Sequence, residues 1–380
     1  MMCSFQNWAS ARLVLFTLCL VSCFQLSSCA NTPEAVVEKT AESPPHFDIR
    51  TGVNISHWLS QSEKRGKARL DYITREDFKR IAALGFDHIR LPMDEIQLNN
   101  EDGSMQEEAF VIIHNAIKWA FEFDLKVIID LHIIRSHHFL DANNLIWTDP
   151  KAQQELLVLW QQLSAELAHY PTDKLAYELL NEAVADNHDD WNYVSGMLIA
   201  DMRKREPSRF IVLGSNRWQG AQTFPMLAIP ENDPYIILSF HFYAPNALTH
   251  HGAPWTAYAE YQGDVFYPGE TVPRNEYANL SPKALTAMKW ASGNYDKNRL
   301  EQIISPAIRV AKEAGLQLYC GEFGAYPLAP KDAIMRWHSD LNDIFRKYDI
   351  SRSHWGYRGD FAIFDTDGNV KQDLVDVLIK

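Results

Sequence analysis

The 380-residue sequence contains few cysteines, and this limits the covalent and metal chemistry open to it. Four of its five cysteines fall within the first 29 residues, and only Cys320 stands in the rest of the chain. A single cysteine has no partner for a disulfide within the chain, and a cysteine-based zinc site needs at least two. The body of the protein is therefore expected to contain neither.

Basic residues are also in the minority. The chain has 36 Lys and Arg against 49 Asp and Glu, a net charge of −13. Arg12 is the only charged residue among the first 29, so the remainder carries 35 − 49 = −14. Because a surface this acidic is repelled by phosphate backbones, we expect no nucleic-acid partner.

Long hydrophobic runs are absent as well. Near the N-terminus, Arg12 precedes an apolar run at residues 13–21, which is shorter than the roughly 20 residues that span a bilayer. A basic residue followed by a short apolar run is typical of a signal peptide. The sequence therefore predicts a targeting segment that is removed from the mature protein.

The end of this segment resembles a bacterial lipobox, Leu26-Ser27-Ser28-Cys29. The resemblance implies lipidation of Cys29, so that residues 1–29 form a lipoprotein-type signal peptide and residues 30–46 a flexible tether. Contact with a membrane is then expected through the lipid anchor only. Because Ala30 stands where an inner-membrane lipoprotein often has aspartate, we expect an outer-membrane or cell-surface protein. The alternative is ordinary secretion into the periplasm or medium.

From Phe47 onward, short apolar runs alternate with longer stretches of helical periodicity, which is typical of βα units around a parallel sheet. The sequence predicts six clear strands, at 88–91, 127–131, 175–180, 210–213, 236–240 and 316–319, and two weaker ones, at 51–53 and 353–355. Eight such strands indicate a (β/α)8 TIM barrel.

One interval between predicted strand ends is too long for a single βα repeat. His241 and Glu322 are 81 residues apart, whereas the other intervals run from 26 to 50. We therefore expect a small inserted subdomain after the sixth strand, at about residues 245–298, within one catalytic domain of residues 47–380.

Two glutamates, Glu182 and Glu322, directly follow predicted strands, and barrel enzymes carry their reacting groups there. Paired carboxylates at a barrel mouth suit glycoside hydrolysis. The alternative is that both are solvated loop residues. Polar side chains gathered at one rim are costly unless they bind something polar, which favours a site. The residues at the rim are Arg90, His132, Asn181, His241, Tyr243 and Trp355.

Six segments in order resemble glycoside hydrolase family 5 of clan A, most closely its clostridial endoglucanase C type, from about Thr51 to the C-terminus. They are Gly52-Val53-Asn54-Ile55, Gly85-Phe86-Asp87-His88-Ile89-Arg90-Leu91-Pro92, Tyr177-Glu178-Leu179-Leu180-Asn181-Glu182, Phe240-His241-Phe242-Tyr243, Leu318-Tyr319-Cys320-Gly321-Glu322-Phe323-Gly324 and Trp355. The resemblance implies a retaining mechanism, a β-glucan as polysaccharide partner, and no metal or organic cofactor.

The resemblance also implies roles for single residues. Glu182 would be the general acid/base, Glu322 the nucleophile, and Asn181 the donor to the sugar 2-hydroxyl. The other matched residues would hold the nucleophile or the sugar: Arg90 and Tyr243 as donors to Glu322, His132 and His241 at the rim, and Trp355 as a platform.

The chain departs from the family pattern after the third strand, where Ile133 follows His132 in place of a second histidine. We expect the missing contact to be absent or rebuilt from His137 or His138. The spacing of these three histidines fits no common metal-binding motif. Glu178 and Cys320 share strand parity with Glu182 and Glu322, so we expect both to be structural and to point into the barrel.

Eleven tryptophans are more than a core usually needs, and a sugar-binding cleft would use several. We expect Trp119, Trp160 and Trp337, on helical patterns, in the core. We expect outer subsites at four loop tryptophans, Trp58, Trp147, Trp218 and Trp255.

The sequence therefore predicts a retaining endo-β-1,4-glucanase, expected to be a monomer. One alternative keeps the fold and mechanism but changes the polymer to mixed-linkage β-glucan, xyloglucan or β-mannan. Another is a surface lipoprotein that binds glycan without cutting it.

Overall fold

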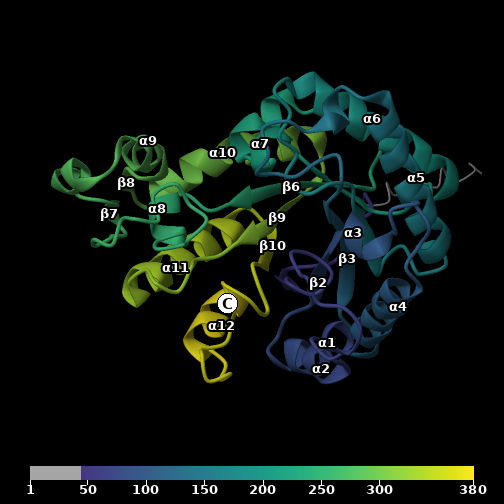
Figure 1. Ribbon diagram of the computed structural model, residues 1–380, viewed down its shortest axis with the longest axis horizontal. Coiled ribbons are helices and arrows are strands. Elements are labelled where there is room, and N and C mark those ends of the chain that lie inside the picture. The colour runs from purple at the N-terminus through teal and green to yellow at the C-terminus, as the bar shows by residue number, and fades with distance from the viewer. Residues whose placement is uncertain (1–43) are drawn as a thin grey trace, which may run out of the picture. The chain divides into compact units, whose positions relative to one another are not determined.

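The computed structural model describes residues 44–380, so the predicted signal peptide, Cys29 and most of the predicted tether lie outside the described residues. Eight parallel strands form a closed barrel in the order β1-β10-β9-β6-β5-β4-β3-β2 (Figure 1). They are β1 (Thr51–Asn54), β2 (His88–Asp94), β3 (Lys126–Ile133), β4 (Leu175–Glu178), β5 (Ile211–Gly214), β6 (Ile236–Phe242), β9 (Gln317–Phe323) and β10 (Ser351–His354). The predicted barrel is confirmed, including its two weaker strands.

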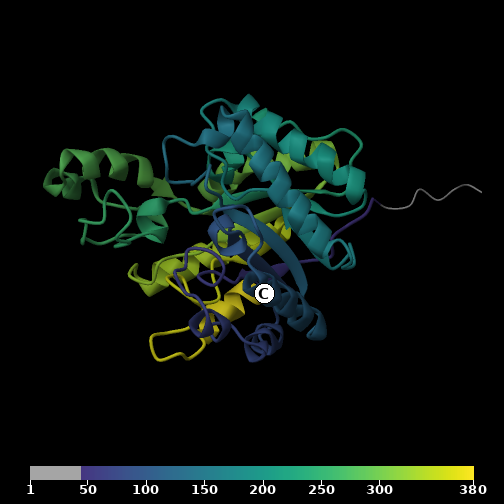
Figure 2. The same ribbon diagram turned by 45° about the vertical axis from the view of Figure 1, so that its right-hand side comes forward.

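Helices connect the strands and surround the barrel, as Figures 1 and 2 show from two directions. The longer ones are α2 (Arg75–Ala83), α4 (Glu107–Glu122), α5 (Pro150–Leu167), α6 (His188–Arg205), α10 (Lys297–Ala314), α11 (Lys331–Lys347) and α12 (Gln372–Ile379). The shorter ones are α1 (Lys67–Leu70), α3 (Glu95–Leu98) and the 3-10 turn η1 (Leu145–Trp147). Between β5 and β6, a chain segment described throughout, only the short α7 (Asn216–Gln219) and the 3-10 helix η2 (Ala221–Met226) form. Among residues 44–380, no helix has both the length and the hydrophobicity to cross a membrane.

Helix ends follow the chemistry of their boundary residues. Thr74 and Asp77 form a reciprocal capping box at the start of α2, in which Asp77 accepts from the Thr74 backbone N–H at 2.8 Å. At the other end of a helix, Gly315 follows α10 with φ of 65°, a conformation in which glycine meets no Cβ clash. Both helix ends are therefore set by residues next to them in the sequence.

The long connection between β6 and β9 forms elements of its own. These are α8 (Asn246–Thr249), η3 (Arg274–Asn279), α9 (Pro282–Ala291) and an antiparallel pair, β7 (Gly269–Glu270) with β8 (Asn294–Tyr295). Figures 1 and 2 show α9 and this pair to one side of the barrel. The segment is tied to helix α11, because Tyr267 donates to Asp340 at 2.7 Å and its carbonyl accepts from Arg336 at 3.1 Å. The predicted insertion falls on this segment.

The described residues form two buried apolar clusters. The smaller one joins Phe47 and Ile49, from the segment before β1, to inward residues of the strands, Ile128, Ala176, Phe210, Val212, Ile237 and Tyr319. Nearer the carboxyl ends of the strands, the buried residues become polar, with Arg90, Asp130 and Glu178 almost fully enclosed. Buried polar groups are tolerated when they are hydrogen-bonded, so this layer has to be a connected network.

Strand β9 contains a bulge that reverses the expected orientation of one residue. Phe240 pairs with Cys320 and the next residue, His241, pairs with Glu322, so Gly321 is an extra residue in β9. An extra residue shifts the alternation of side chains. Cys320 accordingly packs in the larger apolar cluster while Tyr319 belongs to the barrel interior. The prediction that Cys320 points the same way as Glu322 is wrong, although its thiol is buried.

Candidate active site

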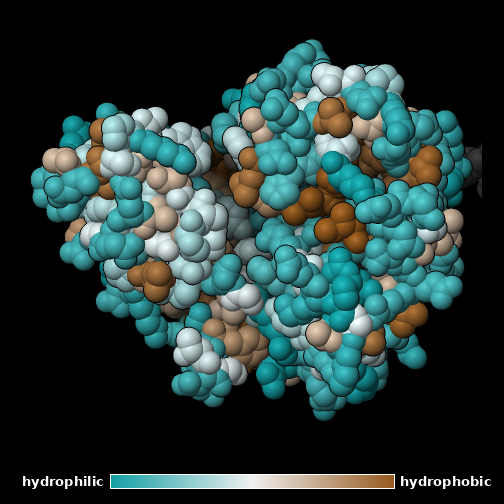
Figure 3. Space-filling view, viewed as in Figure 1, coloured by the Kyte–Doolittle hydropathy of each residue, from teal (hydrophilic) through white to brown (hydrophobic). Residues whose placement is uncertain are grey.

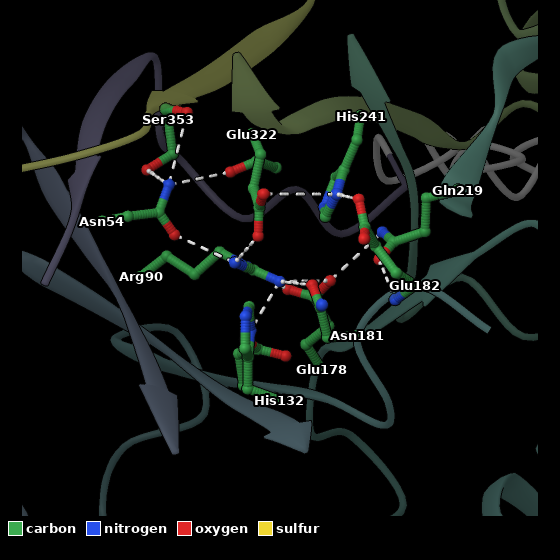
Figure 4. Close-up of polar contacts among 12 residues, drawn as sticks. Asn54, Arg90, His132, Glu178, Asn181, Glu182, Gln219, His241, Glu322 and Ser353 are labelled. Carbon is green, nitrogen blue, oxygen red and sulfur yellow. Dashed lines mark hydrogen bonds and ion pairs between the residues drawn. The ribbon is translucent and has the colours of Figure 1, made fainter. Parts of the chain in front are cut away.

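The two glutamates predicted from the sequence meet at the mouth of the barrel. Glu182 lies four residues beyond the end of β4, and Glu322 lies near the end of β9. One carboxylate oxygen from each and a ring nitrogen of His241 all lie within 4.8 Å of one another. His241 Nδ1 is 2.9 Å from Glu182 Oε1 and 3.6 Å from Glu322 Oε2 (Figure 4). The fold thus brings together carboxylates that are 140 residues apart in the chain.

Arg90 of β2 is the centre of the buried polar network in Figure 4. Its guanidinium donates to Glu178 through Nε at 2.6 Å and Nη2 at 3.1 Å, a bidentate pair. Nη1 donates to Glu322 Oε1 at 2.7 Å, and Nη2 lies 3.0 Å from Asp130 Oδ2. Asn181 accepts a further bond at 2.8 Å. One buried cation therefore serves several buried acids, and Glu178 has the structural role that the sequence predicts.

The two candidate catalytic carboxyls are in unequal surroundings. Burial and the neighbouring charge of Glu322 raise the pKa of Glu182 well above its ordinary value. Burial also raises the pKa of Glu322, but the charge of Arg90 and a hydrogen bond from Tyr243 at 3.0 Å oppose that effect. Glu322 is therefore the first of the pair to ionise, and Glu182 keeps its proton.

Two buried side chains at the mouth have polar atoms with no partner among the described residues, Asn181 Nδ2 and His241 Nε2. The Asn181 side-chain oxygen is fixed by Arg90, which leaves its amide N–H groups for another acceptor. Burial lowers the pKa of His241 well below its ordinary value, so the ring is neutral. Both atoms are therefore available to bond a polar group that lies beside the carboxyls.

His132 and Trp355 form a stacked pair at the mouth, with ring centroids 5.4 Å apart and planes 11° from parallel. Burial lowers the pKa of His132 to about 4, so this ring is also neutral. Its Nδ1 lies 2.7 Å from Asp130 Oδ2, which places the proton on Nδ1 and leaves Nε2 as an acceptor. The stacking fixes the orientation of the Trp355 ring, which is 7% exposed.

Among the described residues, His137 and His138 form no hydrogen bond to His132, Glu182 or Glu322. His137 packs edge-on against Trp147 at 5.3 Å, and neither of its ring nitrogens bonds to a described residue. Instead Gln61 Nε2 lies 3.1 Å from His132 Nε2, with the Gln61 backbone held by Asp94 at 2.7 Å. Sequence reasoning missed Gln61, since a glutamine in a loop after β1 carries no signal of its own.

The tryptophans divide by burial. Trp160 and Trp337 are buried and Trp119 packs against the core, as predicted. Trp58 was expected in an outer subsite, but it is only 1% exposed and its indole donates to the Arg69 carbonyl at 2.7 Å, so that prediction is wrong. Trp147 is half-buried against Trp191.

Two loop tryptophans remain open to solvent, Trp218 at 45% and Trp255 at 46% exposed. Trp218 Nε1 donates to the Phe139 carbonyl at 2.8 Å. Trp255 packs against Tyr326 and Phe361, whose ring centroids lie 5.3 and 6.3 Å from that of Trp255. Figure 3 shows a mainly hydrophilic face with a hollow between two lobes and scattered apolar patches.

Glu182, His241 and Glu322 are also the one group among the described residues with a spacing that could hold a metal ion. A cation requires deprotonated carboxylates, whereas Glu182 has a raised pKa. Arg90 and Tyr243 already donate to the two oxygens of Glu322. The donor set therefore suits proton transfer and nucleophilic attack better than metal binding.

A closed parallel barrel with two enclosed, unequal carboxyls at the carboxyl ends of its strands defines a glycoside hydrolase of the TIM-barrel class. The sequence model of the family Cellulase (glycosyl hydrolase family 5) matches residues 51–360. Endoglucanase C of Acetivibrio thermocellus is 30% identical over 339 residues, which cover 87% of this chain and 98% of that protein. The chain belongs to glycosyl hydrolase family 5, as its motifs predict.

Two further comparisons agree with this placement. Cellodextrinase A of Ruminococcus flavefaciens is 32% identical over 308 residues, covering 80% of this chain and 84% of the relative. The solved structure of Thermotoga maritima Cel5A in complex with mannotriose superimposes with a TM-score of 0.70 at 22% identity. That match covers 88% of this chain and 98% of the other. At this identity the structural likeness supports the fold.

Proposed function

We propose that the protein is a retaining endo-β-1,4-glucanase in which Glu322 is the nucleophile and Glu182 the general acid/base. The observation that supports this assignment is that the two carboxyls have different hydrogen-bond partners. Arg90 and Tyr243 both donate to Glu322, whereas the Glu182 carboxyl contacts the neutral ring of His241. A nucleophile has to be ionised and a general acid protonated, and the network favours these states at the two positions.

The separation of the two carboxyls supports retention of configuration. Retaining glycosidases hold them about 5–5.5 Å apart, whereas inverting enzymes leave about 6.5–9.5 Å for a water molecule. The nearest oxygens of Glu182 and Glu322 lie within 4.8 Å of each other, which fits the shorter, retaining separation better than the longer, inverting one.

In the first step, Glu322 attacks the anomeric carbon while Glu182 gives its proton to the glycosidic oxygen, so the leaving sugar departs as an alcohol. The ester that forms carries no charge on Glu322. Because that charge contributes to the raised pKa of Glu182, its loss lowers this pKa. Glu182, which has just given up its proton, therefore stays ionised and can act as a base. Glu182 then takes a proton from water, the hydroxide attacks the anomeric carbon, and Glu322 is released as carboxylate.

The polymer is proposed from the relatives together with the aromatic surfaces of this chain. A pyranose packs its apolar face on an aromatic ring. Trp218 and Trp255 are exposed rings of this kind, and Trp355 is 7% exposed beside His132. Protein lacking the leader is expected to release oligosaccharides from carboxymethylcellulose. A parallel panel of mixed-linkage β-glucan, xyloglucan and β-mannan tests the alternative substrates. Binding without hydrolysis of any of them would revive the non-catalytic glycan-binding protein.

Azide separates the roles of the two glutamates. With an aryl cellobioside that has a good leaving group, Glu322→Ala plus azide is expected to give the α-glycosyl azide, since azide attacks directly. Glu182→Ala plus azide is expected to give the β-glycosyl azide, because the glycosyl-enzyme forms first. Each variant is the control for the other, and products of the same configuration from both would refute the assignment.

Anchoring through Cys29 belongs to the same proposal and is supported by the lipobox-like segment Leu26–Cys29. Expression in a bacterial host is expected to give a membrane-bound protein whose N-terminal peptide carries acyl groups on Cys29. The Cys29→Ala variant is expected to lose them. An unmodified N-terminus at another small residue would indicate ordinary secretion.

A further inference from the structure

The loop after β5 contains an unusual turn of three residues. Arg217, Trp218 and Gln219 have φ angles of 57°, 59° and 50°, all in the left-handed region. Residues other than glycine avoid this region because Cβ crowds the following carbonyl oxygen. Three in succession persist only where the surroundings hold them, and such local strain is concentrated at functional sites.

This turn is hydrogen-bonded to the loop that contains Glu182. The Trp218 backbone N–H donates to the Ala183 carbonyl at 3.2 Å. The Asn216 side chain accepts from the Ala185 N–H and donates to the Ala185 carbonyl, both at 2.9 Å. Glu182 itself has a φ of 45°, so the candidate acid/base is also in a conformation that needs external support.

Gln219 supplies the most direct part of that support. Its side chain is buried, and its Oε1 accepts from the Glu182 backbone N–H at 3.0 Å. Its Nε2 donates to Glu178 Oε1 at 3.2 Å and to Ser239 Oγ at 3.0 Å. In Figure 4 the amide of Gln219 stands beside Glu182, on the side away from Arg90. Every polar atom of this amide is therefore engaged with strands β4 and β6 or with Glu182.

We propose that Gln219 is a positioning residue for the general acid/base. Its amide fixes the backbone of Glu182 relative to Glu178 and Ser239, and this aims the Glu182 carboxyl at His241 and at the glycosidic oxygen. The inference rests on the proposed role of Glu182. The hydrogen bonds of the Gln219 amide go to Glu182, Glu178 and Ser239 and not to Glu322. Its loss should therefore impair proton donation more than nucleophilic attack.

Leaving groups of different acidity separate these two effects. The 2,4-dinitrophenolate leaves without protonation, whereas phenolate needs a proton from the general acid. General acid catalysis contributes about 10²–10⁴-fold. For Gln219→Met, which removes the amide at nearly constant volume, we expect kcat/KM for phenyl β-cellobioside to fall at least about tenfold further than kcat/KM for the 2,4-dinitrophenyl substrate. The parameter kcat/KM is used because it reports the steps through formation of the glycosyl-enzyme.

A matched control and a second variant complete the experiment. Gln222→Leu alters an exposed glutamine three residues away and should change neither substrate's kcat/KM. Gln219→Asn accepts the left-handed conformation but withdraws the amide from Glu182, so the same selective loss is expected if Gln219→Met does not fold.

Equal losses on both substrates would overturn the inference and leave Gln219 a structural residue. Wild-type protein that cleaves neither aryl cellobioside would instead count against the proposed function itself. Selective loss on the phenyl substrate in either variant supports the positioning role.

Discussion

Replacing Tyr243 by phenylalanine tests how the nucleophile is kept ionised. The phenol donates to Glu322 Oε2 at 3.0 Å, and burial together with Glu322 raises the pKa of Tyr243 well above 10, so it remains a donor. This hydrogen bond favours the charged form of Glu322 and therefore lowers its pKa. Tyr243→Phe removes the bond with little change in volume.

The size of the effect follows from the energy of a hydrogen bond to a charged group, about 1.5–3 kcal/mol. One pKa unit corresponds to about 1.4 kcal/mol, so the pKa of Glu322 should rise by about one to two units. The Glu322 side chain is 6% exposed, so solvent should screen little of this change. Since Glu322 is active when ionised, the acid limb of the pH profile should move to higher pH by the same amount.

The assay is the pH dependence of kcat/KM on a soluble aryl cellobioside, which reports apparent pKa values of the coupled carboxyl pair in the free enzyme. Tyr258→Phe is the matched control, because it loses a hydrogen bond of 3.0 Å to the uncharged Asn246 carbonyl in the connection between β6 and β9. Its acid limb should coincide with that of the wild type. An unmoved acid limb in Tyr243→Phe, with activity lowered equally at every pH, would refute the reasoning.

Two further predictions concern an outer subsite and stability in acid. Trp255→Ala should lower kcat/KM on cellohexaose about 2- to 12-fold while sparing aryl cellobiosides, since stacking on an aromatic ring contributes about 0.5–1.5 kcal/mol. Trp290→Ala, which removes a 71% exposed indole from α9, is the control, and equal effects of the two variants would contradict a subsite at Trp255. Burial lowers the pKa of His338 from 6.5 to about 4, so its contribution to stability is present above pH 6.5 and is lost as pH falls toward 4. The free energy of unfolding measured with urea should therefore depend less steeply on pH in His338→Gln than in the wild type, by about 1.4 kcal/mol per pH unit between pH 6.5 and about 4. An identical slope in His338→Gln and wild type would show that this ring protonates freely in the folded state.

Much of the barrel could be predicted because its signals are local. Apolar runs such as Val127–Leu131 mark strands, and the cap at Thr74 and the stop at Gly315 mark helix ends. These depend on hydrophobic periodicity and on backbone conformation, which each residue expresses within a few neighbours. The position of Glu182 and Glu322 just beyond or near strand ends also follows from local pattern, and it sufficed to nominate both.

Other features depended on contacts between distant segments. The predicted orientation of Cys320 was wrong because the bulge at Gly321 has no local sequence signal. The predicted subsite at Trp58 was wrong because its indole bonds to the Arg69 carbonyl of the following helix. Gln61 and Gln219 carry no recognisable pattern. Their importance is visible only where His132 and Glu182 lie beside them.

The sequence by itself predicted the barrel and the family correctly and nominated the two glutamates, because hydrophobic periodicity and ordered motifs indicate all three. The family resemblance already implied which glutamate keeps a proton, and only the tertiary structure showed the physical cause. That difference arises from the burial of both carboxyls around Arg90, with Tyr243 on Glu322 and His241 on Glu182. A pKa depends on desolvation and on charges a few ångströms away, and residues from β2, β4, β6 and β9 become neighbours only when the barrel closes.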